Sequence, residues 1–86
     1  MTAKDAFLLH LDQPAELVAL LEHDSIHYAV WTRPDSEFDV GLFNVHVFHF
    51  DPVDPNPLIL MRSGVYDLDI QSAMQLVADL MRGVTV

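Results

Sequence analysis

One segment of the chain, residues 40–50, is apolar on both sides when it is read as a β-strand. Side chains alternate across a strand. Three large apolar side chains therefore lie on each face: Leu42, Phe48 and Phe50 on one, and Phe43, Val45 and Val47 on the other. A strand of this kind needs cover on both faces. Because 86 residues leave little material for two covering layers, the first inference is self-association or a partner protein.

The length and charge of the chain restrict its partners. A chain of 86 residues is expected to form one domain, residues 1–86, that buries roughly 60–65% of its unfolded surface. Thirteen acidic residues against four Lys and Arg give a net charge of -9, which repels phosphate backbones and anionic membranes. We therefore expect no direct binding to nucleic acid or membrane. The same charge favours a basic protein surface, including the surface of a nucleic-acid-handling protein.

The chain has no cysteine, which excludes disulfides, thiolate catalysis and cysteine-type zinc sites. Acidic residues interrupt the apolar N-terminal stretch, so it does not resemble a secretory signal. No apolar run has the length needed to span a bilayer. These features predict a cytoplasmic protein.

The first two dozen residues suggest helical structure. Thr2 and Asp5 have the spacing of a capping box and predict a short helix over residues 3–10, although residues 7–9 would also suit a strand. A second helix is predicted over residues 14–23, where the apolar positions have helical spacing: Leu17, Val18, Leu20 and Leu21.

Three later segments are predicted as strands. Residues 26–33 are rich in β-branched and aromatic side chains, and residues 38–50 follow with Gly41 as a possible bulge. Residues 51–57 contain three prolines and form a stiff connection, after which a third strand covers residues 58–66.

The C-terminal segment predicts an amphipathic helix over residues 69–82, with Asp67 or Asp69 as its N-cap. Its apolar positions repeat with helical spacing: Ile70, Ala73, Met74, Val77, Leu80 and Met81. The predicted fold class is α+β, a three-stranded antiparallel sheet with the N-terminal helical segment and the C-terminal helix on one face. The other face would then dimerise or dock on a partner. Alternatively, the N-terminal segment wraps round to cover it.

The sequence predicts no metal, cofactor or catalytic residue. His46 and His49 are three apart, so on a strand they point to opposite faces and cannot chelate one ion. Ser25 and His27 are the closest candidate nucleophile and base, but no elbow motif surrounds them. The three glycines are too scattered to form a phosphate loop.

Carboxylates are expected to gather at one edge of the sheet, because the first turn and the end of the third strand meet there. The predicted partner-binding residues are these carboxylates and one exposed aromatic side chain: Asp35, Glu37, Asp39, Asp67, Asp69 and Trp31. A smaller acidic group is expected at the opposite edge: Asp24, Asp51 and Asp54. An acidic edge of this kind would steer a basic partner.

These observations favour a small, acidic, non-enzymatic protein-binding module that engages a basic surface. By analogy of size and charge, an inhibitor or antidote fits: an immunity protein, an antitoxin or a phage-encoded anti-CRISPR protein. One alternative is a small homodimeric α+β enzyme or ligand-binding protein with a pocket lined by His27, His46, Tyr28 and Trp31. Another is an assembly adaptor or subunit of a larger complex.

Overall fold

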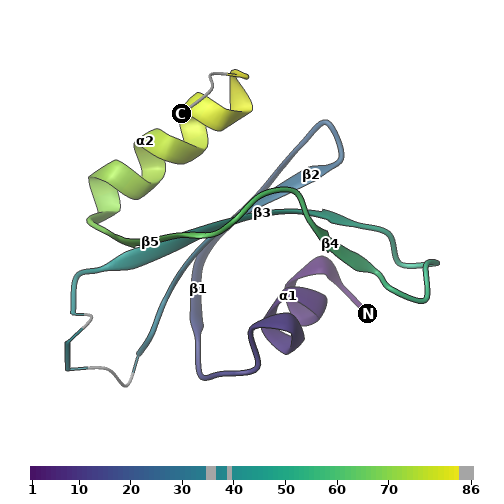
Figure 1. Cartoon of the computed structure of the whole chain (residues 1–86), viewed down its shortest axis with the longest axis horizontal. Helices are drawn as coiled ribbons and strands as arrows, with labels where there is room; N and C mark the ends of the chain where they lie inside the picture. Colours follow the sequence, from purple (N-terminus) through teal and green to yellow (C-terminus); the bar gives the residue numbers. More distant parts are fainter. Residues whose placement is uncertain (35–36, 39, 84–86) are drawn as a thin grey trace.

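The chain begins with helix α1, Ala3–Leu11, in the computed structural model, which describes residues 1–34, 37–38 and 40–83 (Figure 1). The Thr2 side chain accepts a hydrogen bond from the Asp5 amide at 3.1 Å, which satisfies one of the free amides of the first turn. The helix ends at Asp12, whose φ of 50° is left-handed. The predicted N-terminal helix and its cap are confirmed.

The next segment is a strand, β1 (Glu16–His23), and the prediction of a helix over residues 14–23 is wrong. β1 forms an antiparallel hairpin with β2 (Ile26–Thr32), which matches the predicted first strand. Asp24 and Ser25 connect the two strands with φ angles of 51° and 67°. Two consecutive positive φ angles are the geometry that lets a two-residue turn join twisted strands. Pairing with β2 therefore outweighs the helical spacing of the leucines.

The central strand, β3, covers Phe43–Phe50 and starts five residues later than predicted. Gly41 has a φ of +75° and lies in the preceding turn, so it does not form a bulge within the strand. The predicted third strand, residues 58–66, is in fact two strands, β4 (Leu58–Leu60) and β5 (Val65–Leu68). They pair with different ends of β3, Phe48–Phe50 with β4 and Phe43–Val45 with β5.

Among the described residues, five strands form a single antiparallel sheet. The order is β1-β2-β3-β4, and β5 pairs with the same edge of β3 as β4 does, but at the other end of that strand. The outer strands are therefore β1 on one side, and β4 followed by β5 on the other.

Helix α2 covers Ile70–Met81, within one residue of the prediction at each end. Asp69 caps it, because its carboxylate accepts the Ser72 amide at 2.7 Å. The buried side of α2 matches the prediction in part, because Ala73 and Val77 are buried and Leu80 and Met81 pack against the core. Leu76 is 9% exposed and belongs to the core, whereas Ile70 and Met74 are 43% and 39% exposed.

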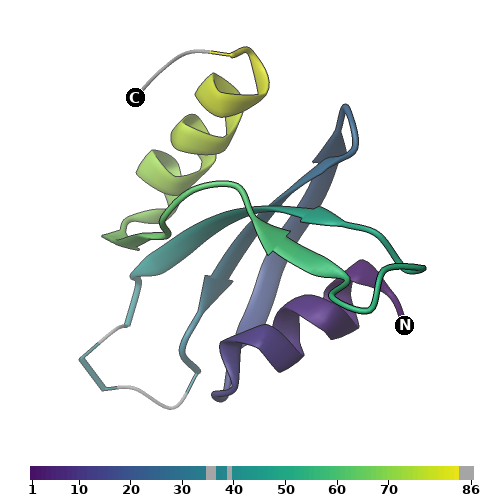
Figure 2. The same ribbon diagram turned by 45° about the vertical axis from the view of Figure 1, so that its right-hand side comes forward.

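The two helices cover opposite faces of the sheet, which corrects the expectation that both lie on one face (Figures 1 and 2). The cluster under α2 comprises buried residues of β2, β3 and the helix: Tyr28, Val30, Val45, Val47, Ala73, Leu76 and Val77. The cluster under α1 comprises Phe7, Ala29, Trp31 and Phe48. The doubly apolar strand thus receives its cover from within the chain, as in the alternative where the N-terminal segment wraps round.

Within the described ranges, neither helix combines the length and apolar character required to cross a membrane.

Candidate functional site

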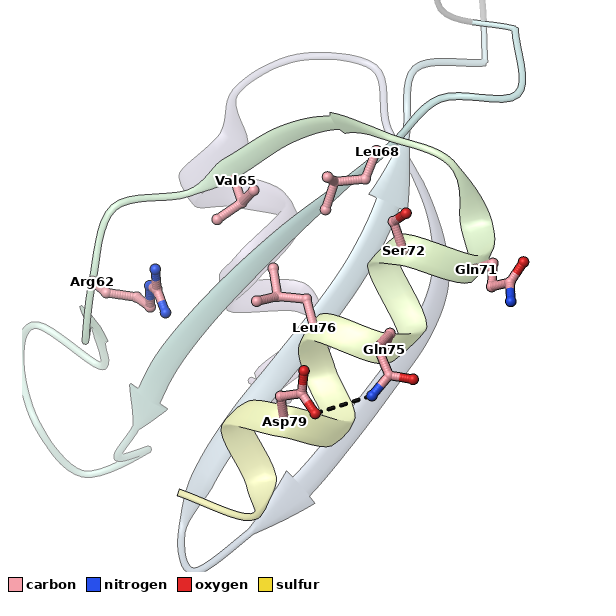
Figure 3. Close-up of a pocket in the computed structure, with 8 residues that line it drawn as sticks. All are labelled: Arg62, Val65, Leu68, Gln71, Ser72, Gln75, Leu76 and Asp79. Atoms are coloured by element: carbon pink, nitrogen blue, oxygen red, sulfur yellow. Dashed lines mark hydrogen bonds between the residues drawn. The ribbon is translucent and has the colours of Figure 1, made fainter. Parts of the chain in front are cut away.

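A groove of about 490 Å³ separates β5 from α2 (Figure 3). Its apolar floor consists of Val65 and Leu68 from β5 and Leu76 from α2. Figure 3 shows Leu76 directed from the helix toward the strand. A smaller groove of about 300 Å³ lies between α1 and residues 56–58.

A left-handed residue shapes the floor of the groove. In a regular strand, Val65 and Leu68 would point to opposite faces because they are three apart. Asp67 has a φ of 62°, and the pairing of β5 with β3 shifts register nearby. The Asp67 amide donates to Oδ1 of Asn44 at 3.1 Å, and Asn44 is buried. This irregularity brings both apolar side chains to the side that faces α2.

Polar side chains form the helical wall of the groove. Gln71, Ser72, Gln75 and Asp79 of α2 line it, and the last three follow the i, i+3, i+7 spacing of one helix face. Gln75 Nε2 donates to Asp79 Oδ1 at 3.0 Å, and Asp79 also pairs with Arg82. The groove therefore combines an apolar floor with a wall of hydrogen-bonding groups, as ligand sites commonly do.

Arg62 stands on the opposite side of the groove from α2, with its guanidinium group directed toward the helix (Figure 3). It forms no hydrogen bond or ion pair with the residues that the structure describes. A guanidinium group presents five N–H donors in a planar fork that matches a carboxylate. Arg62 is thus placed to receive an anionic group at one end of the groove.

Carboxylates flank the other end of the groove. Asp67 and Asp69 are exposed and adjoin Leu68 in the chain. Hydrogen bonds from Ser72, its backbone amide first, lower the pKa of the Asp69 carboxyl below its ordinary value, so the group is charged at neutral pH.

The predicted acidic edge is reproduced in the part that the structure describes. Leu68 pairs with Phe43, so Asp67 and Asp69 lie at the same end of the sheet as the connection between β2 and β3, where Glu37 is exposed. Asp35 and Asp39 lie outside the described residues. At the opposite end, Ile26 pairs with His49, which places the turn containing Asp24 and the connection containing Asp51 and Asp54 together.

Trp31, predicted as an exposed contact residue, lies in the core. It is 0% exposed beneath α1, and the Arg33 guanidinium carbon lies 5.2 Å from its ring centroid. Trp31 is therefore not part of a partner-binding surface, because the N-terminal helix occupies the face where it was expected to act.

A buried histidine joins two aromatic side chains on the α1 side. His46 Nδ1 accepts a hydrogen bond from Trp31 Nε1 at 2.9 Å, and His46 Nε2 lies 3.2 Å from the Tyr66 hydroxyl. Because the indole N–H can only donate, His46 Nδ1 must lack a proton, and the neutral ring carries its proton on Nε2. Burial, and secondarily the nearby His10, lower the pKa of His46 from 6.5.

This arrangement predicts a loss of stability in acid. Protonation of His46 would place an N–H on Nδ1, where it faces the Trp31 donor. Since the folded-state pKa is lowered, unfolded chains bind more protons below about pH 6.5, and stability falls from there until the folded-state pKa is reached. The loss per pH unit is at most about 1.4 kcal/mol from this group. Urea unfolding between pH 7.5 and 5 measures it.

The control for this prediction is His46→Gln, because the glutamine carbonyl can still accept the Trp31 N–H but does not titrate. We expect the free energy of unfolding of this variant to change less with pH than that of the wild type. Equal pH dependence in the two proteins would contradict a role for His46.

The alternative ligand pocket does not form as predicted. Tyr28 belongs to the core under α2, whereas Trp31 lies in the core under α1 together with Phe48, on which the ring of His27 stacks at 5.2 Å between centroids. His46 contacts Trp31 on that same side of the sheet. The four predicted lining residues therefore do not share one pocket.

The described residues contain no group of three His, Asp or Glu side chains that could hold a metal ion.

Sequence reasoning missed Arg62 and the polar wall of α2. The wall has a signal in the sequence, since Ser72, Gln75 and Asp79 repeat with helical spacing opposite Met74. Arg62 has none, because its position depends on the break between β4 and β5. No family model, no curated protein and no solved structure matches the chain.

Proposed function

We propose that this chain is a small, non-enzymatic protein-binding module and that the groove between β5 and α2 holds a basic segment of its partner. The observation that carries the proposal is an open apolar groove of about 490 Å³ beside two exposed carboxylates, Asp67 and Asp69. A largely apolar concavity with a few polar groups is the usual form of a binding site. The flanking carboxylates give it a preference for positive charge.

An exposed apolar side chain next to the groove supports a protein partner. Met61 precedes Arg62, which lines the groove, and is 52% exposed. Two other exposed apolar side chains on these elements do not face the groove, because Met74 lies opposite the polar wall of α2 and Tyr66 contacts His46 on the α1 side of the sheet.

The overall charge supports a basic partner. With a net charge of -9, the chain would attract a cationic surface over distances of about a Debye length, roughly 10 Å at 0.1 M salt. A finer proposal follows, namely that the module inhibits a nucleic-acid-handling protein, as an immunity protein, antitoxin or anti-CRISPR protein would. Carboxylates set against a cationic site compete there with phosphate groups.

The test is quantitative affinity capture from a lysate of the organism that encodes the chain, with a charge-neutral variant. Asp67→Asn with Asp69→Ser removes two charges while keeping the fold, because Asn tolerates a left-handed φ and Ser remains an N-cap. We expect the variant to lose most of the captured basic partner, and 1 M salt to have the same effect on the wild type.

The matched control is Asp12→Asn with Asp24→Asn. These aspartates are exposed, as Asp67 and Asp69 are, and like Asp67 they are left-handed, with φ angles of 50° and 51°, but they lie away from the groove. The control should capture the partner as the wild type does. If both double variants lose it equally, overall charge accounts for binding and the proposed site is wrong.

A further inference from the structure

β5 is an edge strand and also carries part of the apolar floor of the groove. Among the described strands it pairs only with β3, so its outer edge presents backbone groups without a strand partner. An unpaired edge is a template for another extended segment, and addition of a peptide strand beside a groove is a common mode of recognition. β5 can therefore bind the main chain of a partner as well as its side chains.

The dimensions of the groove define the length of its occupant. β5 has four residues, which span about 13 Å at 3.3 Å per residue. On the helical wall, the segment from Gln71 to Asp79 covers about 12 Å of α2 at 1.5 Å per residue. The groove thus accommodates three or four residues in an extended conformation.

The net charges at the two ends differ in sign. Arg62 lies before the start of β5, and Asp79 lines the groove toward the same end (Figure 3). The Asp79 carboxylate is paired with Arg82, whereas Arg62 has no partner among the described residues. Asp67 and Asp69 lie around its end. An antiparallel segment would run from the carboxylates toward Arg62, and a parallel one in the reverse direction.

We propose that the groove captures the C-terminal three or four residues of the partner chain, paired antiparallel to β5, with the terminal carboxylate bound by Arg62. The inference rests on the proposed function and specifies the occupant of the same site. In this orientation basic side chains upstream of the terminus meet Asp67 and Asp69, and an apolar side chain packs on Val65 and Leu68. The parallel orientation would set the terminal carboxylate against the aspartates.

The conformation of Asp67 agrees with recognition of a chain end. Its φ of 62° interrupts the regular edge of β5, since an extended strand requires negative φ. Regular pairing is therefore available at Val65 and Tyr66, the end of the strand that is closer in sequence to Arg62. A peptide whose C-terminus lies at Arg62 can therefore pair with these two residues and does not require a longer strand edge.

The test uses a display library of random seven-residue peptides with free C-termini. We expect enriched sequences to end near an apolar residue and to carry Lys or Arg upstream. The tightest peptide is then synthesised as the free acid and as the C-terminal amide. Amidation should weaken binding about tenfold or more, the range for loss of a charge-assisted hydrogen bond.

Variants of the protein connect that loss to Arg62. Arg62→Gln should weaken binding of the acid about as much as amidation does, and should have little further effect on the amide. Lys4→Gln removes the same charge from α1, on the other face of the sheet, and should leave both affinities unchanged. Equal affinities for acid and amide, or a library without enriched sequences, would overturn C-terminal capture.

A second pair of variants separates this inference from the proposed function. Gln75→Trp places a bulky side chain in the groove wall, whereas Ala78→Trp places it on an exposed part of α2 that does not line the groove. If amidation has no effect but only Gln75→Trp abolishes binding, the groove binds proteins by another mode. If neither variant reduces binding, both proposals are wrong.

Discussion

Replacing Trp31 with alanine is expected to leave much of the protein unfolded. The indole of Trp31, in β2, is 0% exposed in the core under α1, and truncation of a buried tryptophan costs about 3–5 kcal/mol. His46 Nδ1 would also lose its donor, at about 1–3 kcal/mol. A domain of this size is stable by only about 4–13 kcal/mol. Urea unfolding followed by circular dichroism measures the change.

Trp31→Phe is the control, because it keeps an aromatic ring and removes the N–H donor. We expect it to cost less than alanine but more than 1 kcal/mol, about the penalty for a buried group left without a partner. If Trp31 instead formed a contact with another chain, Trp31→Ala would remain folded and change only its oligomeric state. That result in size-exclusion chromatography would contradict the assignment of Trp31 to the core.

Replacing Phe7 with alanine should release α1 from the sheet. Phe7 is 0% exposed and stacks on Phe48 with 5.2 Å between ring centroids, so its loss should cost about 3–5 kcal/mol. Detachment of α1 would uncover an apolar face around Trp31. We therefore expect the variant to bind an apolar dye and to self-associate, as the bare sheet was predicted to do.

Leu9→Ala is the matched control for α1, because Leu9 lies in the same helix but is 66% exposed. It should behave as the wild type in dye binding and in light scattering. A Phe7→Ala protein that stays monomeric and as stable as the Leu9→Ala protein would show that α1 is not needed to cover the sheet.

The elements best predicted from the sequence are those whose local signals agree with their packing. Thr2 and Asp5 form the predicted cap of α1, and Asp69 caps α2 as one of two candidates. β2 and the apolar part of β3 have both strand composition and a buried position. In these elements local preference and tertiary contacts point to the same structure.

Residues 14–23 were mispredicted because their local pattern is ambiguous. Leucines at 17, 20 and 21 suit a helix, and the same residues alternate acceptably in a strand once Leu17 and Ala19 are separated by a register shift. The Asp24–Ser25 turn decides between them, because it returns the chain directly beside β2. Assigning this segment to a helix also removed an edge strand from the predicted sheet.

The candidate site was only half predictable. The acidic end was predictable because Asp67 and Asp69 follow from an antiparallel strand order, which brings them to the end of the sheet that carries the connection between β2 and β3. The groove depends on the left-handed Asp67, on the rotation of α2 that buries Leu76 and on the position of Arg62 after β4. These are consequences of tertiary packing, and no spacing in the sequence encodes them.

An NMR titration of the labelled protein with the tightest selected peptide locates the binding site residue by residue. If the peptide binds in the groove, we expect saturable shifts in backbone amides of residues 62–79, strongest at Val65, Leu68 and Gln75, with little change in α1 or at the turn containing Asp24. Shifts concentrated in α1 or along the outer edge of β1, with the groove amides unmoved, would contradict binding in the groove.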